Sequence, residues 1–173
     1  MLLHEIKSRT LPCFLFFLTL AAAGCGPQEG EVTDTGGEGA TSSVEFALTG
    51  TQINSAINWF ATRKGATTFK NINGQTILAD GHCELAVETS FGRIGAFPSA
   101  TATYLYAKNK GYLRTSGTPP KGASVFYNTS AAGHIALSTG DGHVWSTSVG
   151  HGIGNVGYTY FQNYRGWAMI PWK

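Results

Sequence analysis

Cysteine is scarce in this chain, which has only three among its 173 residues: Cys13, Cys25 and Cys83. The first two belong to an N-terminal segment that we expect to be removed or modified, so Cys83 is left alone in the rest of the chain. A disulfide within a folded domain is therefore excluded. A single unpaired thiol is usually either buried or used in chemistry. Cys83 is the first candidate for a functional residue.

Long apolar runs are also missing. The longest lies between residues 11 and 23 and is interrupted by Pro12 and Thr19. It falls well short of the ~20 residues that cross a bilayer as a helix. Lys7 and Arg9 precede it, which is the charge pattern of a signal peptide. We expect residues 1–24 to be a signal peptide and the protein to be exported.

The end of this segment reads LAAAGC over residues 20–25, small residues that lead directly into Cys25. It resembles the lipobox of bacterial lipoproteins, whose cysteine becomes the lipidated first residue of the mature chain, although Ala22 stands where leucine is commonest. The resemblance implies lipidation at Cys25 and a membrane anchor in the cell envelope, periplasmic or on the outer surface. A plain secretory signal that is cut nearby is the alternative.

Large apolar side chains are almost absent from residues 26–45, which contain five acidic residues and no Lys or Arg. Such a segment buries too little apolar surface to offset the entropy that ordering costs. The sequence predicts a flexible acidic tether over residues 25–45, which would let a domain at residues 46–173 reach away from its anchor. The mature chain of 173 − 24 = 149 residues suffices for one domain and this tether. We expect a monomer.

Acidic residues are few in the predicted domain, which has ten Lys and Arg against four Asp and Glu, a formal charge of 10 − 4 = +6. Such a surface favours anionic surroundings, such as cell-wall polymers or lipid headgroups. No recognition motif accompanies the scattered charges, so nucleic acid is not an expected partner. Asp141, His143 and His151 lack the spacing of a zinc protease, so we expect neither a metal nor another cofactor.

Helical periodicity dominates the first half of the predicted domain. Apolar residues recur at helical spacing from Ile53 to Phe60, and Thr51 or Asn54 could cap a helix that ends near Lys64. A polar loop with the turn Asn73-Gly74 is expected to follow. Two more helices are predicted, at residues 82–91 and 100–110.

The second half has the pattern of strands. Runs of β-branched and aromatic residues predict strands at residues 124–127, 134–138 and 143–147, and one or two closing strands within 158–164 and 166–171. Gly140-Asp141-Gly142 is a hairpin signal, and residues 150–157 have the composition of a glycine-rich loop. Helices followed by strands predict an α+β fold in which N-terminal helices cover a small antiparallel sheet.

Cys83 lies at the start of the predicted helix 82–91. The positive end of the helix dipole and its unpaired N–H groups favour a thiolate there, and the same N–H groups could hold an oxyanion. A cysteine nucleophile also needs a histidine within hydrogen-bonding reach. His134 is the best placed, since it begins an apolar strand. An inert buried cysteine and a hydrogen-bonded edge histidine would explain the same pattern.

Other polar and aromatic residues on these elements have simpler interpretations. Glu84 and Glu88 lie four residues apart on the cysteine helix, which favours a solvated face over an acid pair. Trp145, Trp167 and Trp172 are expected in the core, with the walls of a groove for a glycan–peptide strand as the alternative.

Six segments resemble, in order, the successive blocks of NlpC-like and CHAP-like cysteine peptidoglycan hydrolases. They are residues 59–65 (WFATRKG), 81–87 (GHCELAV), 120–127 (PKGASVFY), 133–138 (GHIALS), 140–146 (GDGHVWS) and 164–167 (YRGW). The resemblance covers about residues 55–172. It implies a papain-like fold, in which a helix with the cysteine at its N-terminus packs on an antiparallel sheet whose strand carries the histidine.

The resemblance also implies catalytic roles. Cys83 would be the nucleophile that attacks a peptide carbonyl, and His134 would take the thiol proton and return it to the leaving amine. The third position, a polar residue that orients the histidine, falls on Ser146, where the family usually has His, Asn, Gln or an acid. A serine hydroxyl orients the ring more weakly, and Ser148 or His151 could substitute for it.

The expected function is therefore a cell-wall hydrolase whose partner is peptidoglycan. The bond cut would be an amide, either between residues of the stem peptide or between the lactyl group of the sugar and alanine. Two alternatives stay open: a catalytically weak wall-binding lipoprotein that retains the fold, and an acyltransferase-like use of the same residues on lipid.

Overall fold

The computed structural model describes residues 47–172. The expected signal peptide, the lipidation site Cys25 and the acidic tether lie outside the described residues. Within the described range, no helix is both long enough and apolar enough to cross a membrane.

The described part of the chain has three helices and two antiparallel sheets, which confirms the α+β class. The elements in chain order are α1 (Gly50–Ala61), β1 (Thr68–Lys70), β2 (Thr76–Leu78), α2 (Cys83–Ser90), α3 (Ala100–Asn109), β3 (Ser124–Tyr127), β4 (His134–Ser138), β5 (His143–Val149), β6 (Gly152–Gly157) and β7 (Tyr164–Ala168). Strands β1 and β2 pair with each other, and the larger sheet has the order β6-β5-β4-β3-β7.

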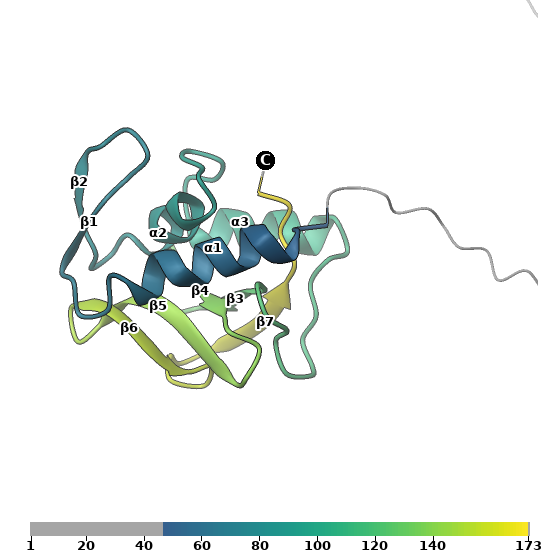
Figure 1. The fold of residues 1–173 in the computed structure, drawn as a ribbon. Coiled ribbons are helices and arrows are strands. Elements are labelled where there is room, and N and C mark those ends of the chain that lie inside the picture. Colours follow the sequence, from purple (N-terminus) through teal and green to yellow (C-terminus); the bar gives the residue numbers. More distant parts are fainter. Residues whose placement is uncertain (1–46, 173) are drawn as a thin grey trace, which may run out of the picture. The chain divides into compact units, whose positions relative to one another are not determined.

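All three helices lie on one face of the five-stranded sheet (Figure 1). Helix α2 packs on β4 and β5, next to α1, and α3 packs on β3 and β4. Side chains such as Phe60, Val87 and Leu137 fill the main core between the two layers. The opposite face of the sheet carries a smaller cluster around Tyr127 and Val144. The start of β4 therefore lies directly beneath the start of α2.

Helix α1 begins earlier than its sequence predicts. Thr49 is the N-cap, in place of Thr51 or Asn54, and its hydroxyl accepts a hydrogen bond from the Gln52 N–H at 3.2 Å. The Gln52 side-chain oxygen accepts in return from the Thr49 N–H at 2.9 Å. This reciprocal capping box satisfies two N–H groups that the helix leaves free, and it fixes the start of the helix.

The expected loop before the cysteine contains a hairpin. Strands β1 and β2 flank a turn in which the side-chain oxygen of Asn71 accepts from the N–H groups of Asn73 and Gln75, each at 3.0 Å. Gly74 has a φ of +78°, which fits the turn predicted at Asn73-Gly74. Strands of three residues are too short to show a period in the sequence, so only the turn was visible there.

In the larger sheet, β3 and β4 have the predicted bounds, and β5 extends two residues beyond its predicted end. The hairpin at Gly140-Asp141-Gly142 is confirmed, since β4 and β5 pair on either side of it. The prediction of a glycine-rich loop at residues 150–157 is wrong. Most of it is β6, which pairs with β5 along its length, because backbone pairing outweighs the low strand propensity of glycine.

The closing segment has one strand. Of the two stretches predicted there, only β7 forms, by pairing with β3 at the far edge of the sheet. Residues 158–163 instead form turns and bends. They cover the face of the sheet that the helices leave free, where Tyr158 and Phe161 pack on the smaller cluster.

Candidate active site

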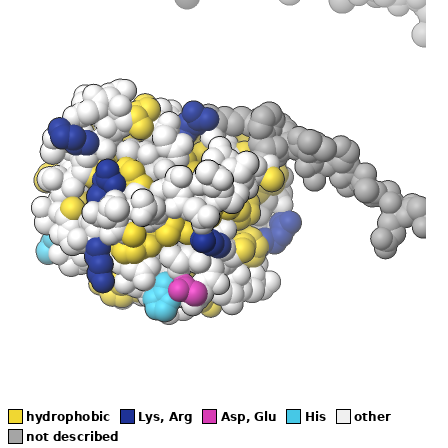
Figure 2. All heavy atoms as spheres, viewed as in Figure 1, with side chains coloured by type: hydrophobic (Ala, Val, Ile, Leu, Met, Phe, Trp, Pro, Cys, Tyr) yellow, Lys and Arg dark blue, Asp and Glu magenta, His cyan; other side chains and the backbone are white. Residues whose placement is uncertain are grey.

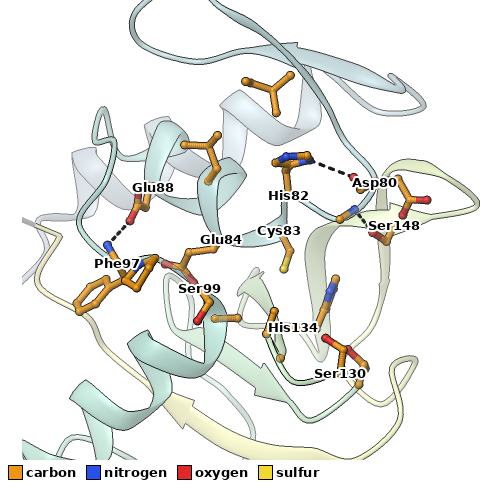
Figure 3. Close-up of a pocket in the computed structure, with 18 of the residues that line it drawn as sticks. Asp80, His82, Cys83, Glu84, Glu88, Phe97, Ser99, Ser130, His134 and Ser148 are labelled. Carbon is orange, nitrogen blue, oxygen red and sulfur yellow. Dashed lines mark hydrogen bonds between the residues drawn. The ribbon is translucent and has the colours of Figure 1, made fainter. Parts of the chain in front are cut away.

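A cavity of about 730 Å³ opens where α2 begins. Its walls come from the β1–β2 hairpin, the first turn of α2, the segment that leads into α3, the start of β4 and the end of β5. Figure 3 shows Cys83 and His134 together in this cavity, one from the helix and one from the sheet. We call it the Cys83 cavity. Two residues that lie 51 positions apart in the sequence thus line one space.

Cys83 is the first residue of α2 and its side chain is buried. The preceding residue, His82, caps the helix without a side-chain hydrogen bond, and the first intrahelical bond runs from the Ala86 N–H to the His82 carbonyl. The N–H groups of the first turn therefore have no helical partner. They lie where an oxyanion that forms next to the sulfur could accept hydrogen bonds.

Burial decides the ionisation of the thiol. It raises the pKa of Cys83 to about 11, and the neighbouring Glu84 adds to the shift, while nearby backbone N–H groups act in the opposite direction. The helix start was expected to favour the thiolate. In the structure the loss of solvation outweighs that effect, so the resting form of Cys83 at neutral pH is the thiol.

His134 is the first residue of β4 and is also buried, with 6% of its surface exposed. Burial lowers the pKa of its imidazole to about 4. At neutral pH the ring is therefore uncharged, with one nitrogen that can accept a proton. A neutral thiol and a neutral imidazole face the same cavity.

Ser146 holds the ring of His134 from the side away from the cavity. The serine oxygen lies 2.8 Å from His134 Nε2, and the hydroxyl donates its only hydrogen to the Ile135 carbonyl at 2.9 Å. Because that hydrogen is already used, the Ser146 oxygen can only accept from the ring, so Nε2 carries the proton. The hydrogen-bond network thus assigns the tautomer in which Nδ1 is free to accept from a thiol.

The two substitutes considered for Ser146 lie elsewhere. Ser148 accepts a hydrogen bond from the Gly81 N–H at 3.2 Å, and His151 Nδ1 lies 3.2 Å from a carboxylate oxygen of Asp80. Hydrogen bonds from Ser148 and His151 lower the pKa of the Asp80 carboxyl. Both residues therefore hold the segment just before Cys83 instead of the ring of His134. Of the three candidates, Ser146 alone contacts His134.

A bulge in β5 brings Ser148 to this position. The register between β5 and β6 shifts between Ser146 and Val149, and Ser148 has a φ of +61°. His151, in the turn between β5 and β6, has a φ of +67°. Left-handed backbone is uncommon for residues other than glycine and clusters at functional sites. The bulge turns Ser148 into the wall of the Cys83 cavity. No sequence pattern predicted the bulge.

Phe161 is a site residue that sequence reasoning missed. Its ring lies against the imidazole of His134, with the two centroids 4.0 Å apart and the planes tilted by 42°. It also lines the Cys83 cavity. By covering one face of the ring it removes solvent, which contributes to the lowered pKa. The segment was expected to be a strand, and one aromatic residue among the four of residues 158–164 carries no functional signal.

The two glutamates of α2 are buried, which corrects the expected solvated face. Glu88 accepts hydrogen bonds from the N–H groups of Gly95 and Phe97, each at 2.7 Å, and so fixes the segment that leads into α3. Glu84 accepts from the Thr103 hydroxyl at 2.8 Å, while its second oxygen is buried without a partner. Burial raises the pKa of Glu84 to about 8. Helical spacing could not distinguish this inner face from an outer one.

The remaining candidates lie away from the cavity. Trp145 and Trp172 belong to the main core and Trp167 packs on the smaller cluster, which confirms the core interpretation. Asp141 and His143 form an exposed pair on the β4–β5 hairpin, with 3.5 Å between His143 Nδ1 and a carboxylate oxygen. Over residues 47–172, no three His, Cys, Asp or Glu side chains converge as metal ligands do.

The arrangement contains the groups that a cysteine-dependent acyl transfer requires: a thiol, an oriented neutral imidazole and free N–H groups at a helix start. No family model, curated protein or solved structure matches this chain. Its function must therefore be inferred from the site itself.

Proposed function

We propose that this protein is an exported, lipid-anchored cysteine hydrolase that cleaves an amide bond of peptidoglycan. The observation that carries the proposal is the contact of 2.8 Å between His134 Nε2 and Ser146 Oγ, which leaves Nδ1 as a base in the cavity that Cys83 lines. A merely structural histidine would gain nothing from a fixed tautomer in a cavity that a thiol also lines.

In the proposed mechanism, His134 Nδ1 takes the thiol proton as Cys83 Sγ attacks the amide carbonyl. Because burial disfavours both charged forms, proton transfer and attack occur together, without a resting ion pair. The carbonyl oxygen becomes an oxyanion that accepts from the Cys83 N–H. The imidazolium then donates its proton to the leaving amine, which yields an acyl-enzyme, and His134 activates the water that hydrolyses it.

The architecture is consistent with a papain-like fold of the NlpC-like and CHAP-like type. A helix that carries the cysteine at its first residue packs on an antiparallel sheet, and the adjacent strand carries the histidine. Ser146 occupies the orienting position at which that family usually has a larger polar or charged residue. The Ser146 hydroxyl compensates in part for its small size and lack of charge, because its hydrogen bond to the Ile135 carbonyl fixes its position.

The charge of the domain favours an anionic polymer as substrate. Since Glu84 and Glu88 are buried, Asp80 and Asp141 are the exposed acids of residues 47–172. Lys and Arg side chains are spread over the visible face in Figure 2 and do not gather into one patch. A distributed positive charge suits a long, repetitive anionic surface such as the cell wall better than a compact ligand.

One observation favours a second candidate, a wall-binding protein without catalysis. A thiol whose pKa is raised to about 11 is a weak nucleophile unless a base acts on it. If His134 did not serve as that base, the fold would still present a cavity and a basic surface. The two candidates differ in whether wall peptides are released.

The test is incubation of purified peptidoglycan with the full chain and with the variants Cys83→Ala and His134→Ala. We expect new free amines and altered muropeptides from the wild type, and a loss of about 10³-fold or more in rate from both variants. His143→Ala is a matched control, because His143 is an exposed histidine of the same sheet that lies outside the cavity.

Equal muropeptide profiles from the wild type and Cys83→Ala would overturn the proposal. Binding of the wild type to walls without any product would favour the second candidate. An equal loss in His143→Ala and His134→Ala would remove the assignment of His134 as the base.

A further inference from the structure

The acids of the domain are concentrated in the Cys83 cavity. Three of the four acids of residues 47–172 line it, namely Asp80, Glu84 and Glu88, and none of the described Lys and Arg residues does. In the whole domain, by contrast, Lys and Arg outnumber the acids. A positive charge that forms in the cavity therefore meets acidic side chains and no lysine or arginine.

Of these three acids, Asp80 is the one that is both charged and exposed. Glu88 is buried and its carboxylate accepts from two backbone N–H groups. Glu84 is mostly protonated at neutral pH, because burial raises its pKa to about 8. The side chain of Asp80 is 55% exposed, and hydrogen bonds from Ser148 and His151 lower its pKa. Asp80 therefore carries a negative charge at neutral pH.

Strained backbone holds the segment of Asp80 in place. Ser148 and His151 both have left-handed backbone, and each contacts this segment. Ser148 Oγ accepts from the Gly81 N–H at 3.2 Å, and His151 Nδ1 lies 3.2 Å from Asp80 Oδ2. Backbone of this kind costs energy in residues other than glycine and persists where the surrounding structure requires it. Here the two strained residues fix one carboxylate at the wall of the cavity.

Strand β5 holds both Asp80 and His134 from neighbouring positions. Ser146 contacts the His134 ring, and Ser148, two residues further and about 7 Å along a strand, contacts Gly81. Figure 3 shows Asp80 and Ser148 on the side of Cys83 where the ring of His134 lies. In agreement with this placement, the charge of Asp80 raises the pKa of His134, although burial has the larger effect and lowers it.

The proposed mechanism needs a positive charge on a buried ring. When His134 takes the thiol proton, its neighbours offer no negative charge. Ser146 and Phe161 are neutral, and Tyr127, whose ring centroid lies 6.0 Å away, donates its hydroxyl hydrogen to the Tyr158 carbonyl. Burial raises the pKa of Tyr127 further above neutral pH. An anion held across the cavity would lower the cost of the imidazolium.

We propose that the Asp80 carboxylate is the counter-charge that stabilises the imidazolium form of His134. It acts through His134 and needs no contact with the substrate. The inference rests on the proposed function for the step in which the imidazolium forms. It goes further by giving a role in that step to Asp80 and to the strained residues that hold it.

The test is the variant Asp80→Asn, which keeps the size of the side chain and an acceptor for His151 while removing the charge. Magnetic resonance of the isotope-labelled full chain measures the pKa of His134, and His134→Ala identifies its signal. We expect this pKa to be lower in Asp80→Asn, with the affinity of the ring for a proton reduced roughly twofold to fivefold, the effect of a half-exposed charge. The kcat/KM on wall fragments at neutral pH should fall by a similar factor. Its acid limb should move to lower pH, because the ring is protonated less readily.

Two variants serve as controls. Asp80→Glu keeps the charge and should hold the pKa of His134 closer to the wild-type value than Asp80→Asn does. Asp141→Asn removes an exposed acid outside the cavity and should leave this pKa unchanged. High salt should reduce the difference between the wild type and Asp80→Asn, because it screens an exposed charge, whereas a purely structural effect would persist. Thermal unfolding of each variant excludes misfolding as the cause.

An equal pKa of His134 in the wild type and Asp80→Asn would overturn the inference, as would an equal decrease in Asp80→Asn and Asp141→Asn. A lower pKa with unchanged kcat/KM at neutral pH would remove the role of Asp80 in the reaction. Should the pKa of His134 respond as expected while walls release no amine, the interaction between Asp80 and His134 would stand and the hydrolase proposal would fail.

Discussion

At the scale of single residues, the ring of His134 is controlled by one hydroxyl. Ser146 accepts from Nε2 and donates to the Ile135 carbonyl, so both of its hydrogen-bonding functions are used. The same residue was predicted from sequence as the third member of the site. Its partner at Ile135 could not be predicted, because it depends on how β4 and β5 face each other.

Replacement of Ser146 by Ala should lower kcat with little change in KM. The variant leaves the Nε2–H and the Ile135 carbonyl without partners and frees the ring to adopt the other tautomer. We expect a loss of about 10- to 100-fold, the range for residues that orient a functional histidine. Steady-state kinetics on wall fragments measures it. Ser146→Thr keeps the hydroxyl and should retain most activity; an equal loss in both variants would argue against the orienting role.

The pH dependence of activity should be broad. Burial lowers the pKa of His134 to about 4 and raises that of Cys83 to about 11. Below the lower value the imidazole is protonated and cannot accept the thiol proton, and above the higher value the thiol has lost that proton. We expect a plateau in kcat/KM across neutral pH with an acid limb near pH 4. A limb between pH 6 and 7 would contradict the neutral resting pair.

At the scale of elements, α2 has an acidic inner face, which sequence spacing alone assigned to solvent. Helix α2 was predicted one residue too long at each end, with Cys83 in its first turn, and it runs from Cys83 to Ser90. The face that turns inward depends on α3 and on the segment before it, and these contacts are long-range. Hairpin β1–β2 was missed because its strands have only three residues each. Strand β6 was missed because pairing with β5 stabilises a segment whose own composition is that of a loop.

Glu88→Gln should weaken the hydrogen bonding between α2 and the segment before α3. The carboxylate accepts from Gly95 N–H and Phe97 N–H at 2.7 Å each, and an amide can accept with only one of its two ends. We expect a loss of about 1–3 kcal/mol in the free energy of unfolding, measured by denaturant titration. Asp141→Asn, in an exposed turn, is the control and should change stability much less.

Glu84 should make the domain less stable as pH rises. Burial raises the pKa of its carboxyl to about 8 in the folded chain, against 4.5 for a glutamate in water. The folded state therefore binds more protons than the unfolded state between these values, so stability falls as pH increases through this window. The denaturant midpoint of the Glu84→Gln variant should change less between pH 5 and pH 8 than that of the wild type. An equal change in both proteins would contradict the raised pKa of Glu84.

At the scale of the whole molecule, the class of fold and the order of most elements were predictable. Local patterns mark helices and strands, and the sheet order follows from hairpins between neighbours in the chain. The exception is β7, which crosses from β6 to pair with β3 at the opposite edge. This crossing carries residues 158–163 over the free face of the sheet and brings Phe161 to His134. No local sequence pattern predicts that the chain crosses from β6 to β3.

Wall binding should depend strongly on salt. The domain carries ten Lys and Arg against four acids, of which two are buried. Attraction between such a surface and an anionic polymer is screened as ionic strength rises. Sedimentation of Cys83→Ala with purified walls should fall severalfold between 50 mM and 500 mM salt, as an order-of-magnitude expectation. Binding to an uncharged glycan, the control, should change little.

The burial of Cys83 also bears on the resistance of its thiol to oxidation. Oxidants and disulfides react with the thiolate, and a pKa of about 11 leaves only a very small part of the sulfur in that form at neutral pH. No second cysteine of residues 47–172 can form a disulfide with it. The desolvation that keeps the proton on the Cys83 thiol thus also protects the sulfur from oxidation, because a thiol reacts with oxidants more slowly than a thiolate.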